Sequence, residues 1–285
     1  MTVSILGQGL GYSLANLFAS REIDTIGVDI NRTAFENPRL DPFMKSYIEK
    51  NKNTIEKHVK FTTDYNEISN SDLVFNFVET PLEPDNRLGI NSVRKAPKSA
   101  LDVINDDCTF VMMSTLPVGG TENLFQEYGE KLSSKYVYCP PMVRQVDFLE
   151  KYLKPPYILL GGFHDEHKKR VHKFLKNIIQ NEPPVWYTIP ANVEIVKLAT
   201  NAFAAMKGVF FNRLADYAKA NKGDPEKVCE MVASHNVVGV GYTKPAGAIG
   251  GVCLPRDMKE LYNASTNQGF SELLKKIEEL NKPFQ

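Results

Sequence analysis

The chain has 285 residues, 42% hydrophobic and 24% charged, which is typical of a globular protein long enough for two domains. Its 34 basic and 34 acidic residues cancel, which argues against general electrostatic attraction to nucleic acid or to a membrane surface. No apolar run approaches the ~18–20 residues of a membrane helix, and no signal peptide is expected before the first strand. The cysteines lack Cys-x-x-Cys spacing, which argues against a zinc site or a disulfide framework and predicts a cytoplasmic protein.

The N-terminal segment carries the pattern of a dinucleotide-binding turn. An apolar strand over residues 3–6 leads into Gly7-Gln8-Gly9-Leu10-Gly11 and then into an apolar helical face. Such glycines allow a tight turn and close approach of a pyrophosphate, which a helix N-terminus attracts. A second strand over 25–28 ends in Asp29, which is placed to accept hydrogen bonds from a ribose 2′-hydroxyl.

The turn departs from the usual G-x-G-x-x-G spacing in one respect. Counted from Gly7, the third glycine falls on Tyr12, and Gly11 comes one residue early. Either the turn is one residue shorter, or Tyr12 packs where a glycine usually stands.

Strands and helices alternate along the rest of the first two thirds of the chain. Apolar runs predict strands at 73–78, 109–113, 136–138, 157–160 and 185–188, and helical periodicity predicts helices at 91–105, 121–133 and 165–180. Residues 31–60 are polar with weak periodicity, and we expect one or two surface helices or a loop there. The alternation predicts an α/β, Rossmann-like, doubly wound and mainly parallel sheet in a dinucleotide-binding domain at 1–190.

A long helix is predicted at 192–221, within an all-helical domain at 191–285. The segment contains no proline and has an apolar stripe at helical spacing: Val196, Ala199, Phe203, Met206, Phe210 and Tyr217. Lys197 and Asn201 are four residues apart and share a face with small residues. They belong either to a site or to a solvated face.

A cysteine near the C-terminus is the strongest candidate for chemistry. Pro255 is favoured at the first position of a helix, so Cys253 is expected at or just before a helix N-terminus. The partial positive charge there favours a thiolate by ~0.3–1 kcal/mol, so a strong nucleophile would need a second cation. The alternative is a buried structural cysteine.

Five motifs, in order, resemble the UDP-glucose/GDP-mannose 6-dehydrogenases, a family of NAD-dependent nucleotide-sugar dehydrogenases. The first is the turn at 7–12 with its acid, Asp29. The others are Val78-Glu79-Thr80-Pro81, the Ser-Thr-Leu-Pro-Val-Gly stretch at 114–119, the E-x-x-K-x-x-x-N-x-F helix at 194–203, and Gly-Gly-Val-Cys-Leu-Pro-Arg-Asp at 250–257. The resemblance covers nearly the whole chain.

The resemblance implies oxidation of a nucleotide-sugar primary alcohol, most simply that of a UDP-sugar, to the uronic acid, with two hydride transfers to NAD. It makes Cys253 the nucleophile of a thiohemiacetal and thioester, with Lys197 and Asn201 stabilising the oxyanion and Asp257 acting as a base or orienting water. The cofactor contacts that it implies are Gly7, Gln8, Gly9, Leu10, Gly11, Asp29, Thr80, Pro81, Ser114, Thr115 and Arg256. It implies no metal. The family pairs through the long helix, so the apolar surface at Phe203, Phe210 and Phe211 predicts a two-fold homodimer.

Departures from the family keep other functions open. Pro141 stands where the family has a glutamate used in substrate turnover, and Arg256 replaces a lysine. The chain ends 32 residues after Cys253, before the family's C-terminal lobe, so a natural short form and a truncated chain are both compatible with it. The alternatives are a small hydroxyacid dehydrogenase of the 6-phosphogluconate/3-hydroxyisobutyrate kind and a catalytically silent NAD-binding or assembly subunit. The sugar and the nucleotide base stay open.

Overall fold

The computed structural model describes residues 1–38, 40–143, 147–251 and 253–282, and it divides the chain into two compact units. Unit 1 comprises Met1–Pro81 and Gly89–Glu194, and unit 2 comprises Leu82–Leu88 and Ile195–Gln285. The domain limits predicted from the sequence stay a prediction. The short segment Leu82–Leu88 joins unit 2 although both of its chain neighbours belong to unit 1, which no sequence pattern indicated.

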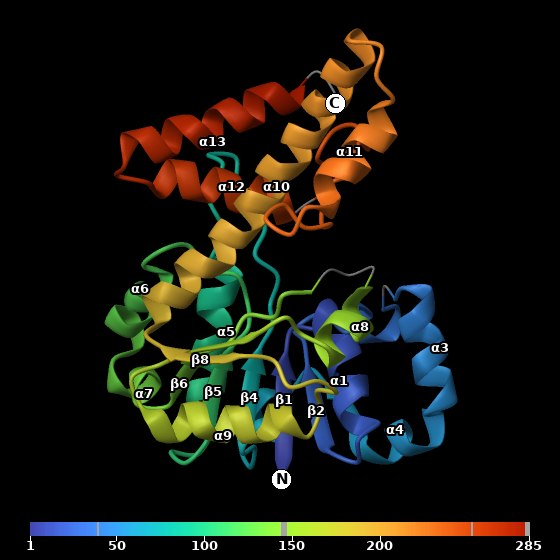
Figure 1. Cartoon of the computed structure of the whole chain (residues 1–285). Helices are drawn as coiled ribbons and strands as arrows, with labels where there is room; N and C mark the ends of the chain where they lie inside the picture. The colour runs from blue at the N-terminus through green and yellow to red at the C-terminus, as the bar shows by residue number, and fades with distance from the viewer. Residues whose placement is uncertain (39, 144–146, 252, 283–285) are drawn as a thin grey trace. The chain divides into compact units, whose positions relative to one another are not determined.

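Unit 1 is built on an eight-stranded sheet (Figure 1). Its strands are β1 (Thr2–Leu6), β2 (Asp24–Val28), β3 (Val59–Thr62), β4 (Leu73–Asn76), β5 (Thr109–Met112), β6 (Tyr136–Tyr138), β7 (Ile158–Gly161) and β8 (Val185–Thr188). Their order is β3-β2-β1-β4-β5-β6-β7-β8, and all neighbours pair in parallel except β6 and β7. Because the chain crosses from β3 over to β4 on the far side of β1, the carboxyl end of β1 is the switch point where such sheets bind ligands.

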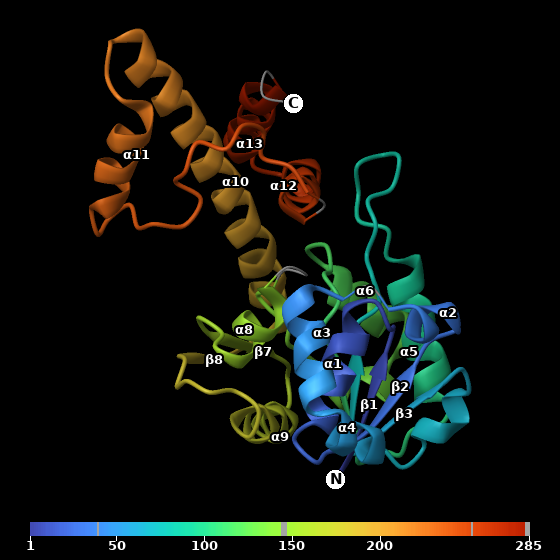
Figure 2. The ribbon, with the colours of Figure 1, turned by 90° about the vertical axis from the view of Figure 1, so that its right-hand side faces the viewer.

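Helices cover both faces of this sheet, as Figure 1 and the turned view in Figure 2 show. One face packs against α1 (Leu10–Ala19), α3 (Pro42–Lys50), α8 (Phe148–Leu153) and α9 (Asp165–Lys176), and the other against α5 (Asn91–Leu101), α6 (Gly120–Tyr128) and α7 (Glu130–Ser133). Strand β4 shows the alternation directly, since Leu73 and Phe75 enter one core cluster and Val74 enters the other. The predicted doubly wound α/β class is confirmed.

The polar stretch at 31–60 was predicted only in part. It forms the short helices α2 (Thr33–Glu36), α3 and α4 (Lys52–His58), and it then begins β3. The sequence missed this strand because β3 lies at the sheet edge, and its residues are half-buried or exposed rather than an apolar run.

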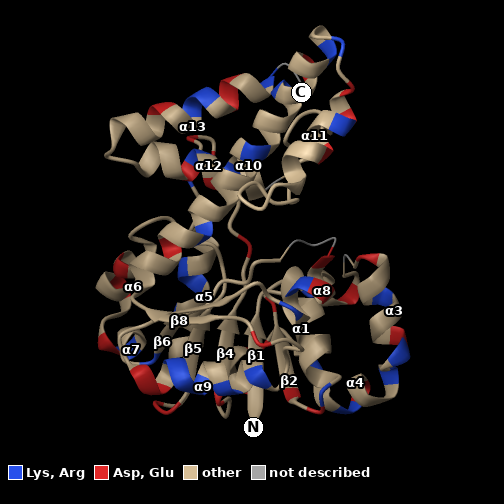
Figure 3. Ribbon diagram, in the orientation of Figure 1, with Lys and Arg blue, Asp and Glu red and all other residues tan. Residues whose placement is uncertain are grey.

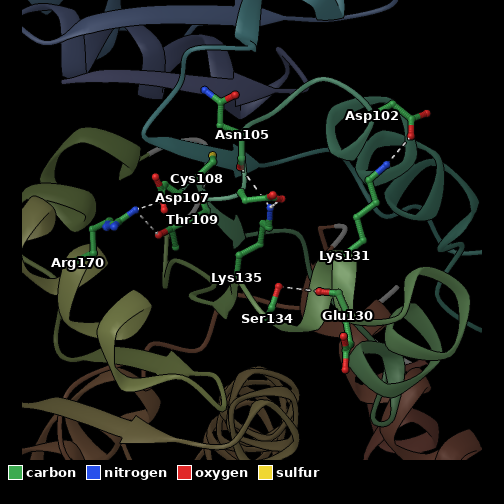
Figure 4. Close-up of polar contacts among 11 residues, drawn as sticks. Asp102, Asn105, Asp107, Cys108, Thr109, Glu130, Lys131, Ser134, Lys135 and Arg170 are labelled. Carbon is green, nitrogen blue, oxygen red and sulfur yellow. Dashed lines mark hydrogen bonds and ion pairs between the residues drawn. The ribbon is translucent and has the colours of Figure 1, made fainter.

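Charged residues form a local network at the amino ends of β5 and β6 (Figure 4). The buried Lys135 donates to Asp106 Oδ1 at 3.2 Å, and Arg170 donates to the Asp107 carbonyl beside Thr109. Figure 3 shows α9 as a helix with acidic residues at its start and basic residues along the rest of its length. The network ties α9 to the loop before β5, at the amino ends of the strands and so at the opposite end of the sheet from the switch point.

Unit 2 is helical. It contains α10 (Pro190–Ala220) from Ile195 onward, α11 (Pro225–Ser234), α12 (Cys253–Ala264) and α13 (Gln268–Asn281), together with the segment Leu82–Leu88. The predicted long helix is confirmed. Phe211, expected on its exposed apolar surface, is instead 1% exposed, because it packs against Cys229 and Ala233 of α11. Among the described residues, no helix has the length and apolarity needed to cross a membrane.

Candidate active site

The glycine-rich turn after β1 requires glycine at its first position and has an exposed glutamate side chain beside its second glycine. Gly7 has a φ of +84°, and a Cβ there would lie 2.8 Å from the Val78 Cα. Gly9 is the N-cap residue of α1, and a Cβ there would lie 2.7 Å from the Glu79 Oε1 atom. No side chain caps the first turn of α1, so its N–H groups face outward as an anion-binding helix end.

The structure resolves the irregular spacing at Tyr12. A Cβ on Gly11 would lie 3.0 Å from Ile5 Cγ2, so Gly11 gives α1 its close approach to β1. The Tyr12 ring points elsewhere and stacks on Phe61 of β3, with centroids 4.8 Å apart. The turn is therefore one residue shorter than the usual pattern, and Tyr12 does not occupy a position that needs glycine.

Asp29 is held at the carboxyl end of β2, beside the turn. Its Oδ2 accepts from the Gln8 N–H at 2.7 Å and its Oδ1 accepts from the Asn31 N–H at 2.8 Å. Each carboxylate oxygen keeps a further lone pair, which suits a ribose hydroxyl. The Gln8 side chain donates to the Ile5 carbonyl at 2.8 Å and is 1% exposed, so it braces the turn from inside. The turn, the uncapped helix end and the acid fit a dinucleotide.

The other predicted cofactor residues of unit 1 also gather at the carboxyl edge of the sheet. Thr80 follows β4 and donates to the Thr115 carbonyl at 2.9 Å, while Ser114 follows β5 and donates to the Asn76 carbonyl at 3.2 Å. These bonds tie the loop that carries Pro81 to the loop after β5. The predicted contacts of unit 1 are thus brought together around the switch point.

A buried carboxylate organises the candidate catalytic residues of unit 2. Asp257 on α12 is 0% exposed, and its Oδ2 accepts from Asn201 Nδ2 of α10 at 2.6 Å. Its Oδ1 accepts from Arg256 Nε at 2.7 Å. Arg256, predicted to contact the cofactor, thus directs its Nε to Asp257, and a cofactor contact by this residue stays a prediction.

Lys197 belongs to the same group. It is buried, and burial lowers the pKa of its ammonium, while the charges of Asp257 and Cys253 raise it and that of Arg256 lowers it further. The lysine therefore lies within electrostatic range of both the carboxylate and the cysteine. Lys197 is buried, so it does not belong to a solvated face, and a functional role for Lys197 and Asn201 stays a prediction.

Cys253 is the first residue of α12 and is exposed, so the alternative of a buried structural cysteine is wrong. Cys108 and Cys229, by contrast, are buried. Pro255 occupies the third helical position rather than the first, because the helix begins two residues earlier than proline preference suggested. Val252, within the same motif, lies outside the described residues. Among the described residues, no group of His, Cys, Asp and Glu is arranged to hold a metal.

Sequence reasoning missed the structural roles of two buried glutamates. Glu194 accepts from the N–H groups of Gly119 and Thr121, each at 2.7 Å, and so caps the N-terminus of α6 from the first turns of α10. Burial raises the pKa of Glu194, and these hydrogen bonds lower it. Glu260 on α12 was missed as well. Only its spacing of three residues from Asp257 could have drawn attention to it.

Both units match models of one protein family. Residues 1–179 match the NAD binding domain of the UDP-glucose/GDP-mannose dehydrogenase family, and residues 191–283 match the central domain of the same family. The chain belongs to this family. It is an NAD-binding member, and the recognition from five sequence motifs is confirmed.

Named relatives agree with this assignment. The chain is 28% identical to the UDP-glucose 6-dehydrogenases of Streptococcus pneumoniae and Campylobacter jejuni, over 92% and 99% of its length. It spans 68% and 72% of those proteins, and 54% of the UDP-glucose 6-dehydrogenase of Rickettsia felis.

Solved structures share the fold. A UDP-glucose dehydrogenase from Pyrobaculum islandicum superposes with a TM-score of 0.87 at 24% identity, covering 99% of this chain and 68% of that one. The 3-hydroxyisobutyrate dehydrogenase of Mycobacterium tuberculosis superposes with a TM-score of 0.67 at 14% identity, covering 99% and 94%. At these identities the likeness establishes the fold.

Proposed function

We propose that this chain oxidises the primary alcohol of a nucleotide sugar, a UDP-sugar in the simplest case, to the uronic acid with NAD as the oxidant. The observation that carries the proposal is the grouping of Lys197, Asn201 and Asp257 with an exposed Cys253 at a helix N-terminus. A thiol that only packed the core would be buried and would not lie within electrostatic range of a buried lysine.

Unit 1 would hold the cofactor. The N–H groups at the start of α1 suit the diphosphate, and the fixed carboxylate of Asp29 suits a ribose 2′-hydroxyl and repels a 2′-phosphate. Two NAD molecules, bound there one after the other, would each accept one hydride, one for each oxidation. Glu79 is exposed, and its carboxylate lies beside Gly9, so a diphosphate at the turn requires this flexible side chain to swing away.

Unit 2 would supply the covalent chemistry. The thiolate of Cys253 forms a C–S bond to the aldehyde carbon, and the carbonyl π electrons move to the oxygen as an oxyanion. The Lys197 ammonium and the second N–H of Asn201 stabilise that oxyanion. Loss of a hydride from the thiohemiacetal leaves a thioester on Cys253, and water then releases the uronate and regenerates the thiol.

Asp257 is the proposed group for the hydrolytic step. Each of its oxygens accepts one hydrogen bond and keeps a lone pair that can orient water or take its proton. Pro141 has no carboxylate to share in this work, whereas the family carries a glutamate at that position. We therefore propose that hydrolysis is slow and that the thioester accumulates.

The test is the yield of NADH per substrate in Cys253→Ser. The unmutated protein should form two equivalents and should gain the mass of an acyl group in intact-protein mass spectrometry. Cys253→Ser should stop at the aldehyde level, because the aldehyde cannot lose a hydride without the thiohemiacetal. Cys229→Ser, a change to a buried cysteine of α11, serves as the matched control. A full two-equivalent yield in Cys253→Ser would remove the cysteine from the mechanism.

One further activity has support from a specific observation. Lys197 and Asn201 can polarise an alcohol during a single oxidation without any cysteine, as a small hydroxyacid dehydrogenase requires. Product analysis distinguishes the three candidate functions. A nucleotide-sugar dehydrogenase yields a uronate with two NADH, a hydroxyacid dehydrogenase yields a keto acid with one NADH, and a silent subunit yields no product.

We also propose a homodimer formed through α10. Val196, Phe203, Phe210 and Tyr217 recur every seven residues and are 38%, 59%, 56% and 68% exposed, so they form one apolar stripe along the helix. A second copy of the same stripe would cover it around a two-fold axis. The proposal places the protein in the cytoplasm, where the described cysteines would stay as free thiols.

A further inference from the structure

A hairpin packs on the helix that carries the nucleophile. Leu82 and Leu88 form an antiparallel bridge, and the Glu83 N–H donates to the Arg87 carbonyl at 2.9 Å. Asn86 closes the turn with a φ of +62° and donates its N–H to the Glu83 carbonyl. The segment Leu82–Leu88 therefore forms a hydrogen-bonded hairpin.

An ion pair between the partly exposed Arg87 and a fully buried carboxylate fixes this hairpin to α12. Glu260 is 0% exposed, and its two oxygens each accept from Arg87 Nε at 3.1 Å. Arg87 Nη2 lies 2.9 Å from Oε1, and the Leu88 N–H donates to Oε2 at 2.8 Å. A fully buried carboxylate is stable only with such partners, and here the hairpin supplies them.

Two weaker contacts extend the same interface. Lys259 donates to the Asn86 side-chain oxygen at 3.1 Å, and Asn263 donates to the Asn86 carbonyl at 3.2 Å. The hairpin thus contacts α12 at three positions over little more than one helical turn, and these contacts limit both rotation and sliding of the helix.

The two buried carboxylates of α12 lie on one side of the helix with the cysteine. Cys253, Asp257 and Glu260 are spaced by four and three residues, so they share a face. Asp257 ties that face to α10, and Glu260 ties it to the hairpin. The position of Cys253 relative to Lys197 of α10 therefore depends on both attachments.

We propose that Arg87 and Glu260 are positioning residues, which hold α12 so that the Cys253 thiolate stays beside the charge of Lys197. The inference rests on the proposed function in that it takes Cys253 to be the nucleophile. The hairpin directly follows Thr80 and Pro81 in the chain, so the same segment that leads out of the predicted cofactor loop also holds the nucleophile helix.

The test measures alkylation of Cys253 by iodoacetamide, residue by residue with mass spectrometry, and needs neither substrate nor cofactor. Arg87→Ala should slow the reaction at neutral pH by about threefold and move its pH profile to higher pH. The Cys253 thiol would lose the neighbouring charge of Lys197, so less of it would be thiolate, and the higher nucleophilicity of that thiolate would offset the loss only in part. Glu260→Gln keeps an acceptor for the Leu88 N–H and for Arg87, and it should stay close to the unmutated rate. Arg94→Ala is the matched control, since Arg94 and Arg87 side chains are both 44% exposed, and Arg94 pairs with the partly exposed Glu127 on α6.

Cys229 reports on unfolding within the same unit, because it is buried on α11. In Arg87→Ala it should stay unreactive while the Cys253 rate falls. If Cys229 becomes reactive in Arg87→Ala, the variant Arg87→Lys is used in its place. Arg87→Lys keeps the charge but loses the two-pronged contact, and its Cys253 rate is compared with that of Arg94→Ala in the same way. A Cys253 rate and pH profile equal to those of Arg94→Ala, in a variant with Cys229 protected, would overturn the positioning role. Failure of the proposed function would appear separately, as a full NADH yield from Cys253→Ser.

Discussion

The contact between Asn201 and Asp257 gives a quantitative test of the candidate site. Asn201→Ala removes a 2.6 Å hydrogen bond to a carboxylate that is 0% exposed. Hydrogen bonds to charged groups contribute about 1.5–3 kcal/mol to stability. Asp257 keeps its bond to Arg256 and the nearby charge of Lys197, so the loss should stay below the roughly 3–5 kcal/mol of an unpaired buried charge. We expect unfolding free energy to fall by about 2 kcal/mol.

Urea unfolding followed by far-UV circular dichroism measures this loss. With a slope on the order of 2 kcal/mol per molar, the midpoint should fall by about 1 M. The single tryptophan, Trp186, lies on β8 in unit 1, so its fluorescence reports on the sheet, while the reactivity of the buried Cys229 reports on unit 2. The shift should be larger in the Cys229 probe than in the Trp186 probe.

Asn221→Ala is the matched control for this experiment. Asn221 follows the last turn of the same helix, is exposed, and donates to the Tyr217 carbonyl at 2.9 Å, so its loss removes a hydrogen bond without touching a buried charge. If Asn201→Ala shifts the midpoint no further than Asn221→Ala, the reasoning about the buried carboxylate is wrong. A double-mutant cycle with Asp257→Asn then isolates the coupling between the two side chains.

Four further predictions follow from other parts of the molecule. Calorimetry should find NAD bound more tightly than NADP because of the Asp29 carboxylate, and equal or tighter NADP binding would contradict the cofactor assignment. Glu79→Gln removes a negative charge beside Gly9 and should strengthen NAD binding by up to about fivefold, so an unchanged dissociation constant would show that the carboxylate does not face the diphosphate. Light scattering should give a dimer at concentrations on the order of tens of micromolar, and Phe210→Glu should give a monomer, whereas a monomeric unmutated protein would refute the interface. Burial lowers the pKa of His167 and of His172 below the ordinary 6.5, so the stability from their neutral forms is complete above that pH and is lost as pH falls through the folded values. His167→Asn should make the melting temperature less sensitive to acid, and an unaltered pH profile would argue against this account.

Local features of this protein were predictable from residues that are neighbours in the chain. Strand, glycine-rich turn and helix follow one another within residues 3–19, so their spacing alone was enough to predict the dinucleotide turn. Lys197 and Asn201 are four residues apart on a helix, which places them on one face whatever surrounds it. The family motifs were readable for the same reason, since each spans only a few neighbouring residues.

Pairings between distant elements were not predictable, because they depend on residues far apart in the chain. Strand β3 forms only because β2 offers it an edge, so no apolar run announced it. The bond from Asn201 to Asp257 joins residues 56 apart, and the pair of Arg87 with Glu260 joins residues 173 apart. Propensity and periodicity act over one or two helical turns, whereas such pairings depend on how whole elements pack. The sequence therefore indicated which residues could do chemistry, and only packing brought the buried carboxylates to the partners that hold the Cys253 helix in place.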